Sequence, residues 1–244
     1  MTNAVARAEA TRESAGHDAA IPRWLWLHLP IALIVVLHFA AAAAPAFYER
    51  WLIPEDGAIE WATPAALVLA MLIAAGTIRS APRRWIRVWL ALFVAGCLYF
   101  AGEEVSWGQR IFRWQTPQPW AAINKQDETN IHNVSPMFDS KPRLLFSVGV
   151  LVGAVIYPLS ARARRALDRV VPREIWPSIV CAPAAIIGLA AGLPERMARL
   201  VTDAPPALLV IPEPGEVKEL YLAVVLALYA ATLRQRFYRP VTAE

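Results

Sequence analysis

The sequence predicts an all-α protein, a polytopic membrane helix bundle of about six transmembrane helices with both termini in the cytoplasm (N-in/C-in). Three observations predict it: the apolar composition, the length of the apolar segments and the placement of the arginines. Of the 244 residues 57% are hydrophobic, and the mean hydropathy is +0.39; soluble domains are about 45–50% apolar. The pI near 9.3 reflects arginines that flank apolar segments, so we expect no nucleic-acid partner.

The apolar segments are each about as long as a helix that crosses ~30 Å of hydrocarbon. They lie at residues 24–45, 58–79, 86–102, 144–160, 175–193 and 217–233. Lipid offers no partner for an open strand edge, and the long apolar segments do not alternate as barrel strands do, so the segments are predicted to be helices. Residues 1–20 are polar and aperiodic, which predicts a disordered cytoplasmic tail before a transmembrane domain at 21–239.

The end of the first apolar segment has a second interpretation, and two other apolar segments each contain a cysteine. Residues 42–46 resemble the small-residue end of a signal peptide, although the apolar segment before them is longer than the usual core of about 7–15 residues. Cys97 and Cys181 both fall inside apolar segments, at depths that differ by roughly 10 Å, and are therefore predicted to be unpaired and buried.

The charges are segregated along the chain. With the N-terminus inside, the inner segments hold 15 of the 24 Lys and Arg residues, and the outer segments hold 14 of the 20 acidic residues. Cytoplasmic loops carry an excess of Lys and Arg, so this distribution predicts the orientation. Residues 102–143 then form a long periplasmic loop.

This loop opens with the segment Gly102–Arg110, which contains two adjacent carboxylates. Glu103 and Glu104 lie at the mouth of a membrane helix, where charge is costly unless it is paired, metal-bound or hydrated. If the helix continues, Trp107 and Arg110 share a face with Glu103, and Arg110 can pair with it. The simpler interpretation is that both carboxylates are solvated and that the tryptophans form an interfacial belt.

A second polar segment, 124–133, reads Asn-Lys-Gln-Asp-Glu-Thr-Asn-Ile-His-Asn. Whether it is extended or helical, Glu128 and His132 lie on a common face. With the GEEVSWGQRIF segment and the Trp-x-Thr-Pro segment between them, these residues resemble a family of uncharacterised bacterial multi-pass membrane proteins. The matching pieces cover about a quarter of the chain, and the resemblance implies a bacterial inner membrane and a motif-bearing outer loop.

The candidate site lies in this outer loop. Glu103, Glu104, Glu128 and His132 are the predicted catalytic residues, and together they suit a divalent metal such as Mg, Mn, Ca or non-haem iron. Further polar side chains are expected to bind the substrate: Trp107, Gln109, Arg110, Asn124, Gln126, Asn130 and Asn133. His38 and Glu60 are second-tier candidates, and Glu216 and Glu219 also lie at outer helix ends, which favours a shared acidic pocket.

Three functions fit these features. One is a metal-dependent hydrolase or transferase that acts on a membrane lipid or lipid-linked headgroup, with a spare carboxylate as general base. Another is a proton-coupled transporter, against which stand the lack of an internal repeat and of charge deep in the inner half of the helices. The third is a non-catalytic binding or assembly subunit. The sequence leaves open which of them holds, and therefore whether the protein is an enzyme.

Overall fold

The computed structural model describes residues 21–54, 56–124, 126–131, 134–202, 206 and 209–237, apart from the side chains of 136 and 138–140. It is an all-α helical bundle: the structure is 76% helical, and no strand occurs among the described residues. The predicted tail at 1–20 and the last residues of the predicted domain, 238–239, lie outside the described residues.

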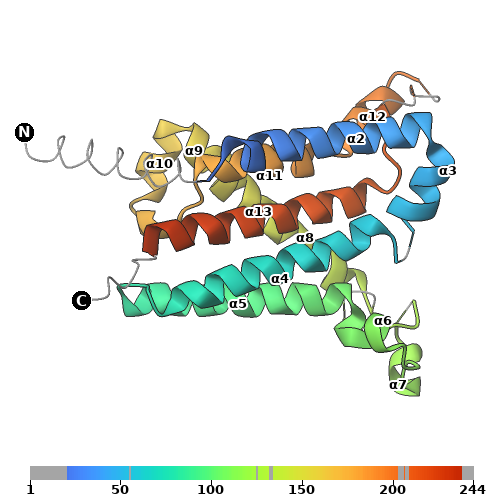
Figure 1. Ribbon diagram of the computed structural model, residues 1–244, viewed down its shortest axis with the longest axis horizontal. Coiled ribbons are helices and arrows are strands. Elements are labelled where there is room, and N and C mark those ends of the chain that lie inside the picture. The colour runs from blue at the N-terminus through green and yellow to red at the C-terminus, as the bar shows by residue number, and fades with distance from the viewer. Residues whose placement is uncertain are drawn as a thin grey trace, which may run out of the picture.

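The long helices run side by side along the long axis of the molecule (Figure 1). The long helical runs, in chain order, are η1 (Trp24–His28) with α2 (Leu29–Ala43), α4 (Ala58–Ile78), α5 (Arg84–Glu104), α8 (Pro136–Val150) with η4 (Leu151–Ile156) and α9 (Tyr157–Leu159), α11 (Ala182–Ala190) with α12 (Leu193–Arg199), and α13 (Pro214–Phe237). The short elements α3 (Pro45–Phe47) and η2 (Tyr48–Leu52) connect α2 to α4. The shorter elements are η3 (Ser106–Gly108), α6 (Gln109–Phe112), α7 (Gln118–Ala121), α10 (Ala161–Leu167), η5 (Arg173–Ile175) and η6 (Ile179–Cys181).

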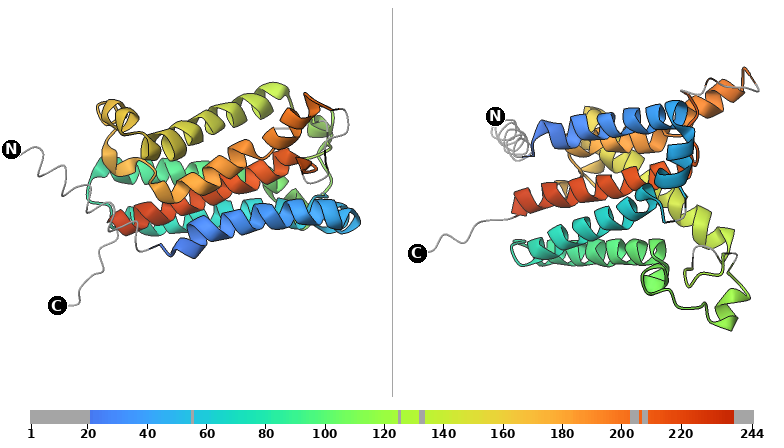
Figure 2. Two further views of the ribbon diagram at one scale, coloured as in Figure 1. Left: turned by 90° about the horizontal axis from the view of Figure 1, so that it is seen from above. Right: turned by 45° about the vertical axis from the view of Figure 1, so that its right-hand side comes forward.

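Among the described residues, five segments are long and apolar enough to cross a membrane, so the chain is a multi-pass membrane protein by length and composition. They are Trp24–Ala43, Ala58–Ile78, Arg84–Glu104, Lys141–Leu159 and Arg173–Arg199. The sequence predicts about six, and the difference is α13, which carries charges near both of its ends. This helix nevertheless lies in the middle of the bundle and ends at the end of the molecule where α2 begins (Figures 1 and 2).

Helix α13 is the centre of the packing. It contacts α4 on one side and α11 on the other, and α4 in turn contacts α5. A Cβ atom added at Gly188 of α11 would lie 2.7 Å from Cβ of Tyr221, so only glycine lets these two helices approach so closely. The Tyr221 hydroxyl donates to the carbonyl oxygen of Pro30, 2.5 Å away, and thereby joins α13 to α2.

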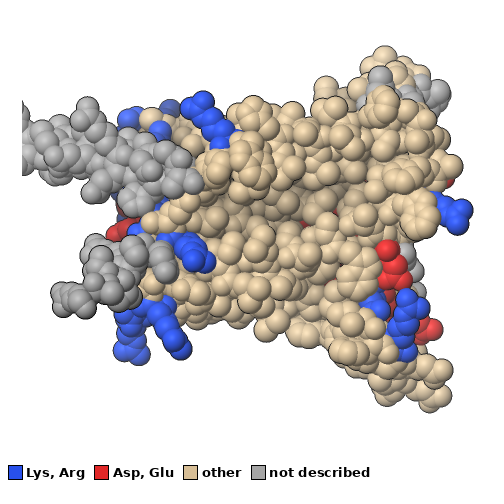
Figure 3. Space-filling model, viewed as in Figure 1, with Lys and Arg blue, Asp and Glu red and all other residues tan. Residues whose placement is uncertain are grey.

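The surface has the pattern of a protein surrounded by lipid. On the face shown in Figure 3, charged side chains gather at the two ends of the bundle, and few charged side chains lie in the band between them. Large apolar side chains such as Val36, Phe39 and Leu92 are exposed in that band. Cys97 and Cys181 are both buried and do not form a disulfide, as predicted.

The fifth predicted segment differs from a single helix. The sequence predicts one helix over 175–193, whereas the chain forms η5, η6 and α11 there. Pro177 and Pro183 lack the N–H groups that an uninterrupted helix needs, and residues before a proline disfavour helical angles. The predicted loop at 102–143 is also shorter than expected, because α5 continues to Glu104 and α8 begins at Pro136.

Candidate functional site

The end of α5 is a sharp reversal of the chain. Ser106 and Trp107 have φ values of +48° and +54°, and Gly108 follows at +100°. The helix therefore does not continue through the motif, as one interpretation of the sequence required. A Cβ atom at Gly102 would lie 2.9 Å from the Trp107 ring, so glycine is needed there for the indole to fold back over α5.

The two adjacent glutamates have different surroundings. Glu103 is buried, and its carboxylate accepts hydrogen bonds from the Trp107 indole N–H at 2.6 Å and from the backbone N–H of Ile131 at 2.7 Å. These bonds fasten both the chain reversal and the 126–131 segment to the end of α5. Glu104, the last residue of α5, is half-buried and lines a cavity on another side of the helix.

The described residues of the second polar segment, Asn124 and 126–131, form neither a strand nor a helix. They bend around Asn124, whose side chain donates to the carbonyl and the side-chain oxygen of Asn130, both at 2.9 Å, and accepts from the backbone N–H groups of Gln126 and Glu128. Asn130 in turn donates to Ser106 Oγ at 3.1 Å and to the Glu128 carboxylate at 2.5 Å.

Gln109 holds the same segment from the α6 side. Its side-chain oxygen accepts from the Thr129 backbone N–H at 2.7 Å, and its amide donates to Thr116 Oγ at 2.7 Å. The polar residues of the two motifs thus bind largely to one another. They build the outer loop, although the sequence proposed many of them as substrate ligands.

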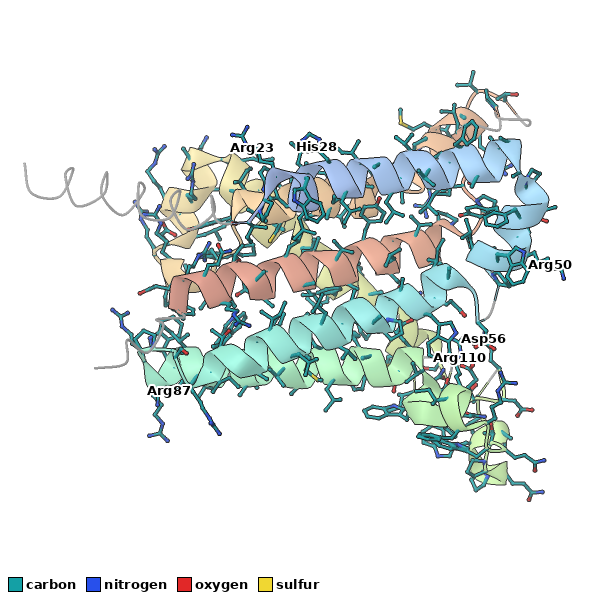
Figure 4. The ribbon with its side chains drawn as sticks, in the orientation of Figure 1. Arg23, His28, Arg50, Asp56, Arg87 and Arg110 are labelled. Carbon is teal, nitrogen blue, oxygen red and sulfur yellow. The ribbon has the colours of Figure 1, made fainter. Side chains whose placement is uncertain are left out.

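Arg110 pairs with α4 rather than with Glu103. It donates to the Glu60 carboxylate at 2.5 Å, to Asp56 at 3.2 Å and to the carbonyl oxygen of Glu104 at 3.2 Å (Figure 4). Burial alone would lower the pKa of Arg110, but its bonds to Glu60 and Asp56 raise the pKa above its ordinary value, so the guanidinium stays charged. The second-tier residue Glu60 therefore anchors the loop to α4.

The other second-tier residue, His38, lies apart from these groups. Its Nδ1 is 2.9 Å from the carbonyl oxygen of Ile34 on the same helix, and it does not line the cavity. His132 and Asn133 lie outside the described residues. Within the described ranges, no three His, Cys, Asp or Glu side chains come together in a way that could hold a metal ion.

The cavity beside Glu104 has a volume of about 300 Å³ and lies among α4, α5, α8, α11, α12 and α13. Its polar wall is formed by charged side chains at the outer ends of these helices: Glu103, Glu104, Arg143, Arg196, Lys218 and Glu219. The deeper wall is apolar and includes Leu67, Phe100, Phe146, Leu189, Leu222 and Leu226. The cavity is therefore charged at the headgroup level and apolar towards the bundle centre.

One face of α13 contributes both kinds of wall. Gly215, Lys218, Glu219, Leu222 and Leu226 line the cavity with the spacing of neighbouring helical turns. Leu226 lies seven residues beyond Glu219, which places it about 10 Å deeper along the helix axis. The charges at this helix end are recognisable in the sequence, whereas the apolar stripe that follows them along the cavity is not.

The carboxylates at the cavity are unequally neutralised. Arg143 pairs with Glu219 at 2.5 Å. Glu104 lies close enough to Glu219, Glu216 and Glu60 to be repelled by them, with Arg143 as the opposing charge. Its side chain has no hydrogen bond or ion pair with another described residue, which leaves it available to a molecule in the cavity.

Of the four predicted catalytic residues, the structure places Glu103 and Glu128 in the loop network and Glu104 in the cavity. Arg143, Lys218 and Arg196 were not among the predicted site residues, because Arg143 lies outside the two motifs and the other two come from segments far from the motifs in sequence. Comparison of the chain with known proteins found no matching family model, no similar curated protein and no similar solved structure.

Proposed function

We propose that this membrane protein binds the headgroup and the first part of the chain of a lipid or lipid-linked molecule in the cavity, and that Glu104 acts on the headgroup as a general acid or base. The observation that carries the proposal is the position of Glu104. Of the described carboxylates that line the cavity, Glu104 is the one without a hydrogen bond or ion pair to another described residue, whereas both oxygens of Glu103 bind the loop.

The cavity suits this class of ligand because its two walls differ. A volume of about 300 Å³ is at the lower end of the range for small-molecule pockets. It accommodates a headgroup and a few methylene groups, while the remaining chain extends into the bilayer. A general base must face its substrate, and such groups contribute about 10²–10⁴-fold to a reaction rate. The reaction class that follows is hydrolysis or group transfer at the headgroup.

The proposal is tested by incubating the purified protein with a bacterial polar lipid extract and comparing the lipids before and after by mass spectrometry. We expect one lipid class to be consumed and a new headgroup product to form. Formation of that product must depend on Glu104.

Binding without chemistry is the second candidate, as in a binding or assembly subunit. It is favoured by the exposed aromatic surface of the outer loop, where Phe112 and Trp114 stack with their ring centroids 5.9 Å apart. Phe112 is 75% exposed, and such a surface fits a protein partner or the interface of the bilayer. If the protein only binds lipid, the lipid extract would contain the same lipids before and after incubation, and one class would remain bound to the protein.

We further propose that the chain lies in a bacterial inner membrane with both termini in the cytoplasm and the cavity facing the periplasm. Arg23 and Arg87 lie at one end of the bundle and Asp56 and Arg110 at the other (Figure 4). The arginine-rich end is the cytoplasmic one by the positive-inside rule.

Cysteine labelling tests this orientation. Gln115 is exposed in the outer loop, and the native Cys97 and Cys181 are buried, so the background reaction is low. In intact spheroplasts, Gln115→Cys is expected to react fully with an impermeant maleimide. A reaction that needs the membrane to be opened would invert the topology.

A further inference from the structure

We propose that Lys218 and Arg196 form a phosphate subsite in this cavity, so that its ligand is a lipid whose headgroup carries a phosphate. This inference rests on the proposed lipid-binding function and specifies the class of lipid. The two cations come from different helices, α13 and α12, and both line the cavity.

Lys218 and Arg196 differ from three other cations at this end of the bundle in having no partner among the described residues. Neither side chain makes a hydrogen bond or ion pair with a described residue. Arg110, Arg143 and Arg199, in contrast, pair with Glu60, Glu219 and Glu195, at distances of 2.5, 2.5 and 2.8 Å.

Two of the cations that line the cavity have no carboxylate partner among the described residues. Arg143 and Glu219 neutralise each other, and Glu103 is engaged by N–H donors of the loop. The charges that act most on Glu104 are those of other carboxylates and of Arg143, so Lys218 and Arg196 have no ion-pair partner among the described residues. Unpaired charge beside hydrocarbon is costly, and a phosphate bound to Lys218 and Arg196 would offset it through charge-assisted hydrogen bonds.

The position of Lys218 on its helix fits a phosphate that is attached to a chain. Leu222 lies one turn deeper on the same face of α13, and Leu226 lies one turn deeper still. A phosphate bound at Lys218 therefore places its ester substituent over an apolar wall. Free inorganic phosphate has the same charge but nothing to fill that wall.

The test is a binding measurement on the full chain in maltoside micelles, with dioctanoyl phosphatidate, dioctanoylglycerol and inorganic phosphate as separate probes. We expect phosphatidate to bind at least tenfold more tightly than the other two probes. Lys218→Gln and Arg196→Gln are each expected to weaken phosphatidate binding by about tenfold, the size of one lost charge-assisted contact. Arg199→Gln, which removes a paired cation of the same helix, should change it by less than twofold.

Equal binding of phosphatidate and dioctanoylglycerol would overturn the phosphate subsite, as would unchanged binding by both variants. Equal binding of inorganic phosphate would overturn the assignment to a lipid. Lys218→Arg serves as the folding control, because it keeps the charge and is expected to restore most of the affinity. Glu104→Gln separates the proposed catalytic role from the proposed phosphate subsite. If the Glu104→Gln variant converts lipid as fast as the wild type, the catalytic role fails while the phosphate subsite stands.

Discussion

Glu104→Gln is expected to reduce conversion of the lipid headgroup by at least about 100-fold, the lower end of the contribution of a general acid or base. The amide has nearly the shape of the carboxylate but cannot take up the proton. Binding of lipid should remain within a few-fold of the wild type. The free energy of unfolding should not fall, because the substitution removes a charge that Glu219, Glu216 and Glu60 repel.

The neighbouring glutamate is the matched control. Glu103 accepts bonds from Trp107 and from the backbone of Ile131, and an amide has one accepting atom in place of two. Glu103→Gln is therefore expected to cost about 1–3 kcal/mol and to speed hydrogen exchange at the Ile131 amide. If Glu104→Gln turns lipid over normally, or if it loosens the loop as Glu103→Gln does, the division of roles between the two glutamates is wrong.

Arg110→Ala is expected to destabilise the protein by about 3 kcal/mol, the cost of removing one partner of a buried ion pair. The side chains of Arg110 and Glu60 are only 16% and 15% exposed, so Glu60 would be left as an unpaired, largely buried charge. The same arginine also donates to the carbonyl oxygen of Glu104, and its loss would free the end of α5 from α4. The measurement is unfolding of the protein in micelles.

The control is Arg83→Ala at the opposite end of the bundle. Arg83 pairs with Glu174 at 2.9 Å, but the two side chains are 61% and 39% exposed, and such surface pairs contribute about 0–1 kcal/mol. Similar stabilities of the two variants would show that Arg110 does not fasten the outer loop to α4.

The sequence was sufficient to predict the bundle, because hydropathy and helix length are properties of each segment alone. The sequence was less informative about features that depend on how distant segments of the chain pack against one another. The shielding of α13 by α4 and α11 lets a helix with charges near both ends occupy the centre, and the reversal at Ser106 and Trp107 depends on left-handed backbone angles. A pattern of residues does not reveal either feature.

The motif residues illustrate why the candidate site was only partly predicted. The sequence drew attention to Glu103, Glu104 and Glu128 because they cluster in one loop. It could not show that Glu103 and Glu128 bind loop donors while Glu104 faces away from them. Lys218 and Arg196 are distant from that loop in sequence, and only the fold brings them to the cavity.

The most direct measurement of the central claim, that the cavity selects a lipid, is site-specific photo-crosslinking from two neighbouring positions of α8. Phe146 lines the cavity, whereas Leu145 is 75% exposed and does not line it. With a photoreactive amino acid at Phe146, we expect adducts dominated by one phosphate-bearing lipid class, which added dioctanoyl phosphatidate displaces. At Leu145 the adducts should follow the bulk membrane composition and resist displacement. The same lipid mixture at both positions, with no displacement at either, would contradict the account.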